Sequence, residues 1–469
     1  MAQSVQTVHA AAASLRRRLT AWGAAGALCA SAALAQPVQQ APSAAPLDVV
    51  QAYQLARDHD ARVRAARAAA QAQRERLPQA QAQLRPQLAL GASRLHNDLT
   101  RTSANLFGQP VTQDERYWSE NATLSLRQPL YRPALTAGVA VAQAQVADAD
   151  AVLAVEENQL AARVAQAYLE VLQAQDQLEL VQVQQRVAQI QLDAARQALE
   201  RGTGTRTDVD DIAARLDLLG ADALRAQQQI EQARRQLQAI TGPFDRPLAP
   251  MDHERIELAP LQPPDLQAWL DRAEAASPEL AALRARADAA QREIDRASAG
   301  HLPTLDLIFQ LTRSASENVT SPSSRYTNRA VGVQFNMPLY SGGYIDSAVR
   351  QAVAEYTRAQ ETLESTRRDL FVRVAEQHQA VIQGQQRVQA LRRAVESART
   401  AVRSSEASLR AGVRTVLDVL DAQQRLSNAE RELRLARYQT LLARLRLSVL
   451  AGDTGEAELQ TLQAQLLQP

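Results

Sequence analysis

The sequence contains no lysine, a single cysteine and no histidine pair at metal-binding spacing, and each scarcity excludes a class of chemistry. Without lysine there is no Walker-type phosphate-binding lysine and no Schiff-base lysine. Cys29 lies in an N-terminal segment that we expect to be removed, so the mature chain should have neither disulfides nor thiolate metal sites. The histidines show no H-E-x-x-H or related spacing. The sequence therefore predicts that the chain is not an enzyme and has no catalytic residue, metal site or cofactor.

Large apolar side chains are also scarce. Hydrophobic residues make up 46% of the 469-residue chain because alanine is abundant, whereas aromatics supply only 4%. This composition is typical of long helices that pack through small residues. Arginine supplies all 52 basic residues against 51 acidic ones, and this balance predicts no nucleic-acid partner. After residue 36 no apolar run of about 18 residues occurs, so we expect no membrane-spanning helix and, if the chain crosses a bilayer, a closed barrel.

The N-terminus has the features of a secretory signal. Arg16 to Arg18 form a basic region, Leu19 to Leu34 an apolar one, and Ala33-Leu34-Ala35 an A-x-A cleavage site. We therefore predict a signal peptide over residues 1–35, followed by a Pro/Gln/Ala-rich leader over 36–46.

The rest of the chain consists of two copies of one structural repeat. Self-alignment pairs the following identical residues around one turn: Leu199, Gly202, Asp208, Val209, Asp211, Arg215 and Leu216 with Leu409, Gly412, Asp418, Val419, Asp421, Arg425 and Leu426. We predict a first repeat over 47–242, a proline-rich joint over 243–264, a second repeat over 265–452 and a C-terminal tail over 453–469.

Each repeat should contain a helix, two strands, a very long helix, a glycine turn and a return helix. Ala134 to Glu200 and Tyr344 to Arg410 lack proline, and at 1.5 Å per residue each would form a helix of about 100 Å. That length is roughly three times the hydrocarbon core of a membrane, so these helices should stand outside it. Their apolar residues follow the 3-4 spacing of coiled coils, which an ordinary coiled-coil protein without a channel would also show.

Four segments alternate between apolar and polar residues, as barrel strands do: Gln87–Asn97, Trp118–Arg127, Thr304–Thr312 and Asn328–Met337. A half-buried soluble sheet would give the same alternation. Their number, the signal peptide and the absence of a soluble domain to cover them favour a barrel. Four strands leave two unpaired edges, which lipid does not tolerate, so several chains must share one barrel.

The turn from Gly412 to Ala422, together with the strand exit from Asn336 to Gly343 and the duplicated layout, closely resembles the TolC family of outer-membrane factors. The resemblance covers residues 47–452. It implies an α+β membrane protein: a homotrimer whose twelve-stranded outer-membrane β-barrel, with four strands per chain, continues into a long α-helical coiled-coil tunnel in the periplasm. It also implies docking on a periplasmic adaptor protein and on an inner-membrane ABC or RND transporter.

By the same resemblance the glycine turns at Gly202 and Gly412 lie at the periplasmic tip. Asp418 and Asp421 match lumen-facing aspartates that determine selectivity at the channel entrance. Arg414 and Asp208 match a pair whose contacts hold the entrance shut, whereas Leu409 stands where TolC itself has a gate tyrosine. Thr205-x-x-Asp208 and Thr415-x-x-Asp418 are also capping-box patterns, which offers a structural role for both aspartates.

The resemblance implies an outer-membrane channel that exports a protein or a small molecule. Gly26-Ala27-Leu28 ahead of Cys29 does not fit a lipoprotein signal, and this favours type I secretion of a protein such as an RTX-type toxin or haemolysin. The alternatives are the outer-membrane factor of a multidrug efflux pump and, from another class, a coiled-coil structural protein. Membrane fractionation would distinguish a coiled-coil structural protein from the two kinds of outer-membrane channel.

Overall fold

The computed structural model describes residues 46–250, 258–316, 323–453 and 455–466. The predicted signal peptide (1–35), the predicted leader except residue 46, and part of the predicted joint lie outside these residues.

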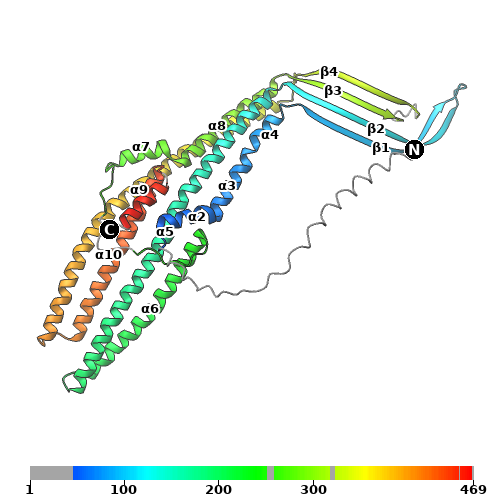
Figure 1. Ribbon diagram of the computed structural model, residues 1–469. Coiled ribbons are helices and arrows are strands. Elements are labelled where there is room, and N and C mark those ends of the chain that lie inside the picture. Colours follow the sequence, from blue (N-terminus) through cyan, green and yellow to red (C-terminus); the bar gives the residue numbers. More distant parts are fainter. Residues whose placement is uncertain (1–45, 251–257, 317–322, 454, 467–469) are drawn as a thin grey trace, which may run out of the picture. The chain divides into compact units, whose positions relative to one another are not determined.

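The described elements follow one order in each half of the chain (Figure 1). The first half contains α2 (Val49–His59), α3 (Ala61–Arg74), α4 (Arg76–Ala82), β1 (Gln87–Ala104), β2 (Pro110–Tyr131), α5 (Pro133–Glu200) and α6 (Arg206–Thr241). The second half contains α7 (Leu266–Ala276), α8 (Pro278–Ser298), η1 (Ala299–His301), β3 (Thr304–Ala315), β4 (Arg325–Asn336), α9 (Tyr344–Arg410) and α10 (Val416–Leu450). A last helix, α11, covers Gly455–Leu466.

The long helices occupy the proline-free runs of the sequence. α9 has the bounds that its run predicted, and α5 begins one residue earlier. Pro133 fits there because the first turn of a helix needs no N–H donor. α5 contacts α6 and α9 contacts α10, so each long helix and its return helix form a hairpin. On α9 a buried valine recurs every seven residues, the spacing of a coiled-coil seam, at Val374, Val381, Val388, Val395 and Val402.

The C-terminal residues and the proline-rich joint form part of the main apolar core, which the sequence did not predict. Leu459 and Leu462 of α11 are buried with Phe244 and Leu248 of the joint. Tyr168 of α5 lies in the same cluster and its hydroxyl donates to the carbonyl oxygens of Leu47 at 3.1 Å and Ala249 at 3.3 Å. The segment predicted as a tail is therefore a helix that helps to close this core.

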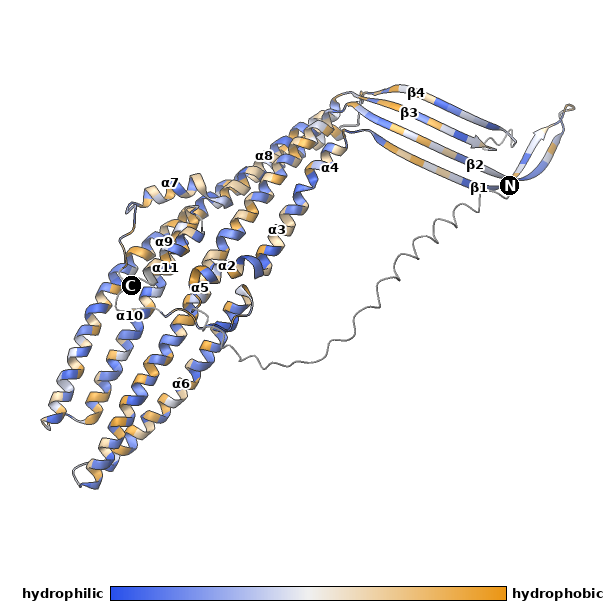
Figure 2. Cartoon of the chain, viewed as in Figure 1, coloured by the Kyte–Doolittle hydropathy of each residue, from blue (hydrophilic) through white to orange (hydrophobic). Residues whose placement is uncertain are grey.

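The strands form one antiparallel sheet in the order β1-β2-β3-β4, so β1 and β4 are its edges. Its apolar side chains share one exposed face, including Leu90 and Val331, which are both 75% exposed. Such a large exposed apolar face marks contact with another apolar phase. β1 and β2, at 18 and 22 residues, are longer than predicted. Beyond the apolar rows the hairpin continues through polar pairs such as Asp98 with Arg116, where the alternation that predicted the strands ends (Figure 2).

A buried ion cluster joins the sheet to the helices. The Asp306 side chain on β3 is only 3% exposed and accepts hydrogen bonds from Arg127 Nε of β2 and Arg132 Nε of the α5 N-cap, each at 2.9 Å. Because one carboxylate binds two guanidinium groups from different elements, the strand exits and the start of α5 are held together. Removing Asp306 would leave both guanidinium groups without the carboxylate that they share.

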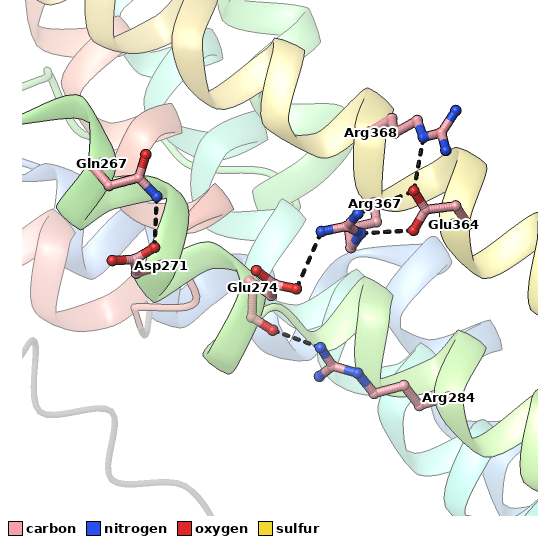
Figure 3. A network of polar contacts seen from close by, with 7 residues as sticks. All are labelled: Gln267, Asp271, Glu274, Arg284, Glu364, Arg367 and Arg368. Atoms are coloured by element: carbon pink, nitrogen blue, oxygen red, sulfur yellow. Dashed lines mark hydrogen bonds and ion pairs between the residues drawn. The ribbon is translucent and has the colours of Figure 1, made fainter.

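A second network links the helices of the second half (Figure 3). Arg367 of α9 contacts Glu274 of α7 at 3.4 Å and Glu364 of its own helix at 2.8 Å. Hydrogen bonds from Arg367 and Arg368 lower the pKa of the Glu364 carboxyl to about 2. Glu364 is thus ionised at neutral pH and holds both arginines.

Among the described helices only α5 includes a segment that could cross a membrane by length and composition, whereas the sequence predicted none. Its acidic residues make contacts typical of a helix inside a bundle. Asp148 pairs with Arg286 of α8 at 2.9 Å and Asp150 pairs with Arg74 of α3 at 2.7 Å. α5 therefore packs as one long member of the helical part.

Candidate functional site

The candidate site consists of the two turns that connect each long helix to its return helix. Gly202 lies between α5 and α6 with φ +70°, and Gly412 lies between α9 and α10 with φ +72°. A Cβ at either position would meet no atom within 4 Å, so backbone conformation rather than crowding requires glycine. The amide of Thr203 donates to Ala198 O and that of Val413 to Ser408 O, both at 2.9 Å, which satisfies carbonyls at the helix ends.

Both return helices begin at a capping threonine. The Thr205 hydroxyl accepts a hydrogen bond from the Asp208 amide at 3.1 Å, and the Thr415 hydroxyl accepts one from the Asp418 amide at 3.3 Å. At the second turn Asp418 Oδ2 also accepts from the Thr415 amide at 2.9 Å, which completes the capping box. At the first turn Asp208 Oδ2 accepts only the Thr205 hydroxyl, at 2.7 Å, so the predicted box is incomplete there.

Asp418 and Asp421 share one exposed face of α10. They lie three residues apart, whereas Val419, Leu420 and Ala422 beside them are buried on the opposite face. Hydrogen bonds from the Thr415 amide and hydroxyl lower the pKa of Asp418, and the nearby Arg414 and Arg425 act in the same direction. The two carboxylates therefore share one exposed face of α10, with Arg414 and Arg425 near Asp418.

The predicted gate pair is not in contact within one chain. Arg414 Nη1 donates to Ser405 Oγ at 2.9 Å, and Ser405 is only 1% exposed on α9. Asp208 instead bonds with Thr205. The structure thus gives Arg414 a role within its own hairpin, and a contact with Asp208 stays a prediction. Leu409, at the position of the family's tyrosine, is half-buried.

Residues that the sequence analysis did not predict as site residues connect the two hairpins near the turns. Arg215 Nη2 of α6 donates to Gln424 Oε1 of α10 at 2.7 Å, and Gln191 Nε2 of α5 donates to Gln423 Oε1 at 3.2 Å. Leu420 of α10 packs in a cluster with Leu192, Ala195 and Ile212 of the first hairpin. Self-alignment had marked Arg215 as a repeated position but could not identify its partner.

A hollow of about 680 Å³ lies farther along the helices, between α5, α6 and α10. Its lining is mostly polar and includes Asp222, Arg225, Arg431 and Glu432. Within it the Tyr438 hydroxyl donates to Asp176 Oδ2 at 2.6 Å, and burial together with the Asp176 charge raises the Tyr438 pKa. In the described part of the chain, no group of three or more His, Cys, Asp or Glu side chains is placed to hold a metal ion.

Comparison with known proteins accounts for this arrangement. A sequence profile described as outer membrane efflux protein matches residues 52–243 and 269–453. The chain is 33% identical over 425 residues to the alkaline protease secretion protein AprF of Pseudomonas aeruginosa, covering 90% of this chain and 88% of AprF. It is 32% identical over 426 residues to the proteases secretion protein PrtF of Dickeya chrysanthemi, covering 90% of this chain and 92% of PrtF.

The fold agrees with that of solved structures. The outer membrane protein VceC of Vibrio cholerae superposes with a TM-score of 0.72 at 21% identity, covering 86% of this chain and 96% of VceC. The sheet with its exposed apolar face thus consists of barrel strands, and the hairpins are the helices of a periplasmic tunnel. This chain belongs to the outer membrane efflux protein family, the TolC family, whose members are outer-membrane channels for export and not enzymes.

Proposed function

We propose that this outer-membrane channel exports a protein by type I secretion. One observation carries the proposal: AprF and PrtF, both named for protease secretion, each match 90% of the chain. The cargo would be a secreted protease, or an RTX-type toxin or haemolysin as the sequence predicted. Small-molecule efflux is the second candidate, because the family profile itself is described by efflux.

A trimer would complete the barrel. The sheet has two unpaired edges, β1 and β4, and lipid offers no hydrogen-bond partners for them. Pairing β4 of one protomer with β1 of the next closes the sheet, and three copies give the twelve strands that the family resemblance implies.

The proposed assembly includes a periplasmic adaptor and an inner-membrane ABC transporter, or an RND transporter if the cargo is a small molecule. The polar hollow between α5, α6 and α10 supports adaptor docking, because it offers both charges and a concave surface on the helices outside the membrane. Energy for export would come from the transporter.

Deletion of the gene tests the proposed cargo. We expect extracellular protease or haemolysin activity to be lost while the same protein accumulates inside the cells, and complementation with the wild-type gene to restore secretion. Drug susceptibility serves as the second measurement. Unchanged secretion together with increased drug susceptibility would replace type I secretion by efflux.

At the entrance, we propose that Asp418 and Asp421 face the lumen and that Arg414 and Asp208 act as a gate. Six carboxylates in a narrow trimeric entrance would favour cations and allow multivalent cations to block. Replacing both aspartates by alanine should weaken block and shift ion selectivity in planar-bilayer recordings. Arg414→Ser should raise single-channel conductance, because it removes the side chain that, in the proposed gate, contacts Asp208 and holds the entrance closed. Unchanged selectivity in the double alanine variant would mean that the two aspartates have only a structural role. Unchanged conductance in Arg414→Ser would mean that Arg414 is not part of the gate.

A further inference from the structure

The sheet carries a hollow of about 830 Å³ beyond its apolar rows. Its lining comes from all four strands. Small side chains and charged side chains alternate around it: Ala92, Ala122, Ala315, Arg94, Glu120, Arg313, Arg325 and Thr327. The alanines leave space at the floor, and the long arginine side chains stand around it.

The hollow opens on the outward face of the barrel. Side chains alternate between the two faces of a strand, so Arg94 shares the face of Leu90 and Leu88. On β3, Arg313 likewise shares the face of Leu311 and Phe309. The register places Arg94 opposite Glu120, Ala122 opposite Arg313, and Ala315 opposite Arg325, so these side chains form one continuous patch.

This patch has an excess of positive charge. Arg94 lies 3.4 Å from Glu120. Arg313, Arg325 and the neighbouring Arg329 are exposed, and within the described residues none of them has an ion-pair partner. Farther out on the β1–β2 hairpin, Arg116 pairs with Asp98 at 3.1 Å.

Chain connectivity places the hollow toward the outside of the cell. Both strand hairpins leave from the helical part, which is periplasmic, so their turns point outward. On β3 the apolar row begins at Leu305 and ends just before Arg313. This stretch measures about 27 Å along the strand, and a tilt of about 40° makes it a rise of roughly 20 Å, close to the roughly 25 Å height of an outer-membrane apolar band. The arginines therefore lie at the outer interface, where cations on the lipid face are tolerated, and the apolar rows lie on their periplasmic side.

We propose that this hollow binds the phosphate groups of a phosphorylated glycolipid, such as lipid A, from the outer leaflet. A guanidinium group presents paired donors that match phosphate oxygens and is weakly hydrated, so it suits an interfacial anion site. The alanine floor accommodates the headgroup, and Leu90 and Leu311 below contact its acyl chains. The site acts on the barrel from outside and does not depend on which cargo is exported.

Lipid binding to the purified, detergent-solubilised oligomer tests this site. Native mass spectrometry would follow titration with diphosphorylated lipid A and with the same lipid after removal of its phosphates. We expect the phosphorylated lipid to bind at least about tenfold more tightly, as expected for one or two charge-assisted hydrogen bonds. Arg313→Gln/Arg325→Gln should abolish this preference, whereas Arg313→Lys/Arg325→Lys should retain part of it.

The matched control is Arg85→Gln/Arg116→Gln, which removes the same number of arginines from a position just before β1 and a position within β2, both outside the hollow, and should leave binding unchanged. Each variant is used only as the heat-labile oligomer, so a folding defect is not mistaken for lost binding. Equal affinity for both lipids, or equal losses in the hollow and control variants, would overturn the proposal. Displacement of the lipid by an equal concentration of inorganic phosphate would also overturn it, because the site would then bind a free anion.

Discussion

The two hairpin turns share a glycine conformation and a threonine cap but differ in their side-chain contacts. Gly202 and Gly412 adopt nearly the same φ, and both return helices begin at a threonine cap. Arg414 of the second turn bonds to the buried Ser405. The equivalent position in the first turn is Gly204, where a Cβ would lie 2.9 Å from the Leu199 amide nitrogen. The first turn is thus too tight for the contact that the second turn makes.

The starts of the two return helices also differ in the burial of one equivalent position. Leu420 of the second return helix is 3% exposed against the first hairpin, whereas Asp210, its equivalent, is exposed and within 3.8 Å of Arg206. The two copies therefore keep the turn glycine and the threonine cap, which the backbone conformation requires. Their other side chains differ because the two hairpins have different neighbours. At this position the second return helix packs against the first hairpin through Leu420, whereas the first return helix presents Asp210 to solvent.

The largest effect should come from Leu420→Ala. Truncating this buried side chain removes its contacts with Leu192 and Ile212 and should cost about 2–5 kcal/mol. Asp210→Ala at the exposed equivalent should change stability by less than about 0.5 kcal/mol. Hydrogen exchange of the α10 and α6 amides measures both changes. Equal acceleration in the two variants would contradict the inferred difference between the tips.

The turn glycines should respond alike. Gly202→Ala and Gly412→Ala each force an L residue into a left-handed conformation and should destabilise the local turn by about 1–2 kcal/mol. Gly220→Ala is the matched control, because Gly220 lies inside α6 with open space around its Cβ position. There alanine should stabilise the helix by about 0.5–1 kcal/mol. A neutral result at either turn would show that its backbone can change conformation.

The threonine caps should also behave alike, with a smaller effect. Thr205→Ala and Thr415→Ala each remove one acceptor for a helix N-terminal amide, at a cost of about 1 kcal/mol. Exchange of the Asp208 and Asp418 amides is the direct readout. A serine at either position keeps the hydroxyl and should restore protection, which distinguishes capping from a general loss of packing.

The smallest effect should come from pH, and it should distinguish the complete capping box at Thr415 from the incomplete one at Thr205. The folded pKa of Asp418 lies below its unfolded value, so its cap stabilises the second turn fully above the unfolded pKa, about 3.9. That stabilisation is lost as pH falls through the folded pKa. Asp418→Asn should therefore increase exchange at the second turn at neutral pH, and this difference from the wild type should vanish in acid. A difference that persists in acid would assign the effect to something other than the carboxylate charge.

Features determined locally could be predicted from the sequence. The absence of proline and the 3-4 spacing of apolar residues identified α5 and α9, since helix formation depends on neighbours within a few residues. The turn glycines were identifiable because a positive φ excludes most other residues. Strand alternation identified the sheet but not its full length, because Arg94 and Asp98 interrupt the apolar pattern where the strands leave the apolar band.

By itself, the sequence determined the duplicated helix and strand pattern, the glycine turns, and the family to which the chain belongs. Only the tertiary structure decided which residues meet. Arg414 bonds to Ser405, Leu420 packs between α5 and α6, and α11 joins the core around Tyr168. The arginines of the outward hollow come together only through strand register. These contacts join residues distant in sequence or depend on which side of a turn a side chain leaves, and periodicity within one segment carries neither kind of information.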